Sequence, residues 1–156
     1  MTALTLTQQS VKQRPDHLAV SYLTLERTVG WLTYRQVWYL AGLIARCLSG
    51  SVLAVAIDDG PYLALAELAG WRRGMVLVPL DPHDPVARLR HVAAEAGASC
   101  IVTKDWGDAK KLADAAEAEV IDLSLAVPLF ELSEQELQEP HEQDPEPECD
   151  PESVAY

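Results

Sequence analysis

Residues 74–88 read Gly-Met-Val-Leu-Val-Pro-Leu-Asp-Pro-His-Asp-Pro-Val-Ala-Arg. The apolar run 75–78 stands between a glycine and a proline-rich exit, which predicts a short strand buried on both faces. Pro79 has no N–H and is expected to end the hydrogen-bond ladder there. Asp84 precedes Pro85, so we expect its carboxylate to cap a helix whose first position is the proline. A strand, a rigid turn and a capped helix are therefore predicted in immediate succession.

The same alternation of strand and helix extends in both directions from this stretch. Thr33 and Gln36 form a Thr-x-x-Gln capping box that opens a helix. Before it we expect a weak helix ending near Pro15 and two short strands, 17–22 and 31–33. The other predicted strands are 52–57, 98–103 and 119–123, and the other predicted helices are 34–48, 61–73 and 108–118. Short connections favour right-handed βαβ crossovers, so the predicted fold class is α/β, with an open, mostly parallel sheet and helices on both faces.

Charge divides the chain of 156 residues unevenly. Residues 1–111 hold all 12 Lys and Arg with 10 Asp and Glu, whereas residues 112–156 hold 14 acidic and no basic residues. We therefore expect one α/β subdomain over 1–130, an acidic, proline-rich loop or linker over 131–152, and the start of a strand at 153–156. A solvated loop is the simpler interpretation of the acidic segment, and a site for a basic partner is the alternative. The acidity speaks against a nucleic-acid partner.

The three cysteines, Cys47, Cys100 and Cys149, lie about fifty residues apart and have no zinc-type spacing. An odd number of widely spaced cysteines indicates a reducing compartment. The first residues do not resemble a secretory signal, and the apolar stretches are too short to span a bilayer. We expect a cytoplasmic protein without a membrane span.

Several residue groups admit a chemical interpretation and a structural one. Asp58 and Asp59 before Gly60 could bind a metal, but these residue types favour a strand-to-helix turn with a solvated acidic pair. Arg72 and Arg73 could meet phosphate, but at a helix end they are expected to complement the helix dipole.

Asp81 and His83 could form an acid–base pair, because ligands bind at strand ends of α/β sheets, but the prolines favour a structural turn. We expect His91 on the surface and Cys47 and Cys100 as small core residues rather than nucleophiles. The remaining candidates are aromatic residues, which could form a stacking platform for single strands but favour core and edge packing in the absence of a basic groove: Trp31, Tyr34, Trp38 and Tyr39.

Residues 32–37 read Leu-Thr-Tyr-Arg-Gln-Val, and residues 71–81 read Trp-Arg-Arg-Gly-Met-Val-Leu-Val-Pro-Leu-Asp. They resemble two core motifs of the adenylate-forming (AMP-binding) superfamily, usually Leu-Thr-Tyr-x-Glu-Leu and Leu-Lys-Ala-Gly-x-x-Tyr-Val-Pro-Leu-Asp. This superfamily includes the acyl-CoA synthetases and the adenylation domains of nonribosomal peptide synthetases. Residues 15–20, 82–89, 96–98 and 101–103 continue the resemblance in register. Trp71, Arg73 and Leu77 depart from the usual motif.

This resemblance implies the N-terminal subdomain of an AMP-dependent synthetase or ligase. The whole enzyme would use ATP and Mg²⁺ to convert a carboxylic acid to an acyl-adenylate, then pass the acyl group to a thiol of CoA or of a phosphopantetheine carrier. The family's phosphate loop and catalytic motifs would follow Tyr156, in a C-terminal part that this chain needs as its partner. No catalytic, cofactor-binding or metal-binding residue is assigned here, and the chain alone is expected to be inactive. The alternative is a non-catalytic α/β module whose acidic tail binds a basic partner.

Overall fold

The computed structural model describes residues 2–23, 27–113 and 118–127. The predicted acidic loop, 131–152, and the strand start at 153–156 lie outside these residues. Within the described ranges the elements alternate as the sequence predicts, and none of the helices has the length and apolarity needed to cross a membrane.

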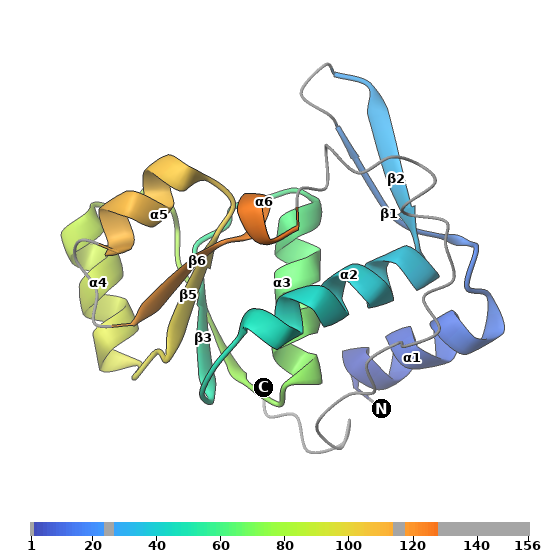
Figure 1. Ribbon diagram of the computed structural model, residues 1–156, viewed down its shortest axis with the longest axis horizontal. Helices are drawn as coiled ribbons and strands as arrows, with labels where there is room; N and C mark the ends of the chain where they lie inside the picture. Colours follow the sequence, from blue (N-terminus) through green and yellow to red (C-terminus); the bar gives the residue numbers. More distant parts are fainter. Residues whose placement is uncertain (1, 24–26, 114–117, 128–156) are drawn as a thin grey trace.

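The centre of the fold is a four-stranded parallel sheet (Figure 1). Its strands are β3 (Val52–Val55), β4 (Val76–Pro79), β5 (Cys100–Thr103) and β6 (Glu119–Asp122), in the order β4-β3-β5-β6. Because all neighbours are parallel, each strand's carboxyl end meets the same edge of the sheet. This confirms the predicted open α/β sheet.

Helices cover both faces of the sheet, and alternate residues of each strand divide the core in two. Leu53 and Val55 face the cluster formed with α1 (Ala3–Gln13), α2 (Tyr34–Cys47), α3 (Pro61–Arg72) and the short α6 (Leu123–Ala126). Ala54 and Ile101 face the smaller cluster formed with α4 (Val86–Glu95) and α5 (Trp106–Ala113). Figure 1 shows α4 and α5 on one side of the sheet and α2 and α3 on the other.

A separate antiparallel hairpin, β1 (Leu18–Leu23) and β2 (Val29–Thr33), precedes α2 and projects from the body of the molecule (Figure 1). The predicted capping box joins the hairpin to α2. Thr33 N donates to Gln36 Oε1 at 2.8 Å, and Gln36 N donates to Thr33 Oγ1 at 3.4 Å. This box therefore fixes where strand ends and helix begins.

The structure corrects three expectations about residues 74–88. β4 is not buried on both faces, because it is an edge strand, and Val76 is exposed. Pro79 does not end the ladder, since Leu80 N still donates to the Val55 carbonyl at 2.8 Å, and an edge strand tolerates proline. Asp84 does not cap α4: the N-cap is Pro85 without a side-chain hydrogen bond, and Asp84 instead pairs with Arg88 at 3.2 Å.

Candidate functional site

The carboxyl edge of the parallel sheet is where open α/β folds bind ligands, and here three loops meet at it. The loop after β3 carries Asp58 and Asp59, the loop after β4 carries His83, and Lys104 directly follows β5. Each loop begins at the carboxyl end of a strand of the parallel sheet, so the sheet itself brings these charged side chains together. We call these four residues the edge cluster.

Lys104 is the centre of the edge cluster. Its Nζ lies 2.5 Å from Asp58 Oδ1 and 2.6 Å from Asp59 Oδ1. The other oxygen of Asp58 lies 3.2 Å from His83 Nε2. The side chains of Asp58 and Lys104 are about one-third exposed, whereas those of Asp59 and His83 are largely in solvent. The ammonium group of Lys104 therefore links the loops after β3 and β5, and Asp58 links them to His83 in the loop after β4.

These contacts shift the titration of the two most enclosed members. The hydrogen bond from Lys104 lowers the pKa of Asp58, against an opposing effect of partial burial. Partial burial lowers the pKa of Lys104, but its bonds to Asp58 and Asp59 outweigh that effect, so the net pKa is raised. Both groups are thus held in their charged forms as an ion pair, which does not suit either one to proton transfer at neutral pH.

Asp81 and His83 do not form an acid–base pair. Asp81 Oδ1 accepts a hydrogen bond from the backbone N of His83 at 2.9 Å, and Asp84 N donates to the Asp81 carbonyl at 3.0 Å. The imidazole instead contacts Asp58. The structural turn favoured by the sequence is confirmed.

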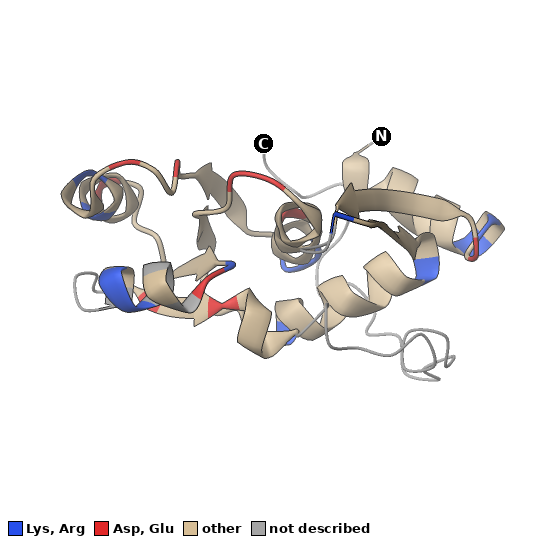
Figure 2. Cartoon of the chain, turned by 90° about the horizontal axis from the view of Figure 1, so that it is seen from above, with Lys and Arg blue, Asp and Glu red and all other residues tan. Residues whose placement is uncertain are grey.

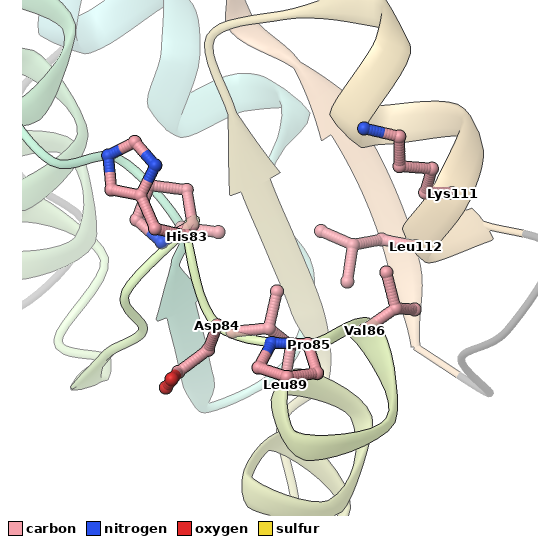
Figure 3. Close-up of a pocket in the computed structure, with 9 residues that line it drawn as sticks. His83, Asp84, Pro85, Val86, Leu89, Lys111 and Leu112 are labelled. Carbon is pink, nitrogen blue, oxygen red and sulfur yellow. The ribbon is translucent and has the colours of Figure 1, made fainter.

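A cavity of about 250 Å³ lies beside the edge cluster, between the start of α4 and the end of α5 (Figure 3). In Figure 3 the Asp84 carboxylate points away from the α5 side chains that line the opposite wall. The volume is below the roughly 300–1,000 Å³ typical of ligand pockets, and no nucleophile–base pair faces it. Its lining residues are Ala56, Pro82, His83, Asp84, Pro85, Val86, Leu89, Lys111 and Leu112.

The edge cluster does not fit a magnesium ion. Mg²⁺ takes oxygen ligands in near-octahedral geometry, but both aspartates of the cluster are already ion-paired with Lys104. Within the ranges that the structure describes, no group of three or more His, Cys, Asp or Glu side chains is placed to hold a metal ion. The turn with an acidic pair is confirmed, with the difference that Lys104 binds the pair.

Arg72 lies in the last turn of α3, where a basic residue was expected to complement the helix dipole, and it is buried there. Only 2% of the residue is exposed, and its guanidinium carbon lies 3.9 Å from the centroid of the Trp38 ring. Nη1 donates to the Trp38 carbonyl at 2.5 Å. Arg72 therefore joins α3 to α2 inside the core and is not presented to a phosphate.

The other sequence candidates divide between core and surface. Cys100 is fully buried, and burial raises the pKa of its thiol, so the predicted core role is confirmed. Cys47 is exposed at the end of α2, so its predicted core role is wrong. Trp38 is buried and His91 is exposed, as expected, whereas Trp31 is 62% exposed and departs from the expected packing.

Sequence reasoning missed the role of Lys104, because its partners lie 45 and 46 residues away along the chain. The position of Lys104 in the sequence could nevertheless have predicted this contact. A lysine that directly follows a predicted parallel strand must lie at the same sheet edge as acids that follow another such strand.

The family comparison matches the chain to "AMP-binding enzyme" over residues 7–156. Among curated relatives, the chain is 32% identical over 106 residues to nonribosomal peptide synthetase GRA1 of Gibberella zeae, covering 64% of this chain and 1% of GRA1. It is 34% identical over 118 residues to chondramide synthase cmdD of Chondromyces crocatus, covering 69% of this chain and 3% of the synthase. The chain thus spans only a small part of the length of these relatives.

Solved structures match at the level of the fold. The crystal structure of VinN superimposes with a TM-score of 0.71 at 22% identity, covering 81% of this chain and 34% of VinN. The N-terminal subdomain of Klebsiella oxytoca NpsA, solved with 3-hydroxybenzoyl-AMSN, gives a TM-score of 0.62 at 22% identity, covering 81% of this chain and 31% of that chain. The family match covers nearly all of the sequence, and the chain therefore belongs to the AMP-binding enzyme family.

Proposed function

We propose that this chain forms the N-terminal α/β part of an adenylate-forming synthetase that activates a carboxylic acid with ATP. The observation that carries this proposal is the family match over residues 7–156, together with a fold that superimposes on about a third of VinN. In this proposal the acyl-adenylate is formed by the whole domain and passed to a thiol of CoA or of a phosphopantetheine carrier.

Neither the edge cluster nor the cavity beside it fits ATP or Mg²⁺. The aspartates at the carboxyl edge are bound by Lys104, and the edge cavity is small. We therefore derive no catalytic step from this chain. Its proposed contribution is positional: the parallel sheet and its helices form a rigid body against which the nucleotide-binding part of the domain is held.

ATP–pyrophosphate exchange tests this proposal. The purified 156-residue chain, with Mg²⁺ and a panel of amino and other carboxylic acids, is expected to give no exchange and no ATP-dependent rise in Tm. A chimera in which this chain replaces the aligned third of VinN is expected to restore exchange. The first acid to assay is 3-methylaspartate, with which VinN has been solved.

The outcomes separate the possibilities. Exchange by the chimera, but not by the isolated chain, supports the proposal. Exchange by the isolated chain would mean that its own residues build a nucleotide site, and Asp81 and His83 would then be the first to mutate. A folded chimera without exchange would contradict the proposal. The alternative function, a module whose acidic tail binds a basic partner, depends on residues 131–152, which lie outside the described residues.

A further inference from the structure

We draw no further inference here: the strongest candidate, the surface patch of exposed basic residues on α4 and α5 (Arg88, Arg90, Lys110 and Lys111; Figure 2), carries none, because Arg88 is already paired with Asp84 and nothing in the structure shows what covers the patch.

Discussion

Substituting Gly50 with alanine should destabilise the fold substantially, although the glycine lies in an exposed turn between α2 and β3. Gly50 has a φ of 78°, and a Cβ there would lie closer than 3.0 Å to the Cβ and Oγ of Ser99. A left-handed conformation costs an L-residue about 1–2 kcal/mol. The contact with Ser99 adds to this cost, because relieving it requires the serine to move.

Ser99 cannot move without loss. Its Oγ accepts hydrogen bonds from Ser51 N at 3.1 Å and Val52 N at 3.4 Å, which fix the start of β3 beside the start of β5. Each such bond contributes about 0.5–1.5 kcal/mol. With the left-handed cost, the expected loss is about 2–5 kcal/mol if both bonds are lost. At about 2–4 °C per kcal/mol, Tm should fall by roughly 4–20 °C.

Urea denaturation of the 156-residue chain, followed by far-UV circular dichroism, measures this loss. The same substitution in a Ser99→Gly background separates its two parts, because the steric contact is gone there and only the left-handed cost of about 1–2 kcal/mol remains. The reasoning is refuted if Gly50→Ala costs less than about 1 kcal/mol, or if the cost is the same in both backgrounds.

Three further predictions concern the edge cluster, the core and the thiols. The pKa of Asp58 is lowered in the folded protein, so its stabilising effect is present above its unfolded pKa of about 3.9 and is lost as pH falls toward the folded value. The urea midpoint of Asp58→Asn should therefore fall less steeply than the urea midpoint of the wild-type chain between about pH 5 and 2. Parallel pH curves for the two proteins would contradict this. Arg72→Ala should lower the free energy of unfolding by about 2–4 kcal/mol, because it removes a buried side chain, its hydrogen bond to the Trp38 carbonyl and its contact with the Trp38 ring. An unchanged urea midpoint would show that this packing is dispensable. In a Cys149→Ser background, a thiol reagent should modify Cys47 in the native protein and Cys100 only on unfolding, and reaction of both at one rate would disagree with their burial.

Local signals in the sequence were sufficient for most individual elements. Thr33 and Gln36 are three residues apart, and the capping box they form depends on no distant partner. The start of α3 at Pro61 is equally local, since proline suits the first turn of a helix. The apolar run after residue 51 predicted β3 correctly because β3 lies between β4 and β5, so that helices cover both of its faces.

Features that depend on strand order could not be predicted in the same way. The apolar run of β4 resembles that of β3, but β4 is at the edge of the sheet, so Val76 is exposed and Pro79 fits within the strand. The edge cluster has the same origin, because Lys104 meets Asp58 only after β5 pairs with β3. The burial of Arg72 beneath Trp38 likewise follows from the packing of α3 on α2. Sequence spacing alone does not fix any of these contacts.

The edge cluster and the β1–β2 hairpin differ in whether their interactions are completed within the described residues. At the carboxyl edge, Asp58 and Asp59 are both ion-paired with Lys104, and the loops after β3 and β5 are joined through it. An ion that displaced Lys104 would leave a partly enclosed ammonium without its counter-ions, which opposes binding there. At the hairpin the opposite holds, since covering Leu23, Val29 and Trp31 removes apolar surface from water without breaking any polar contact that the structure shows.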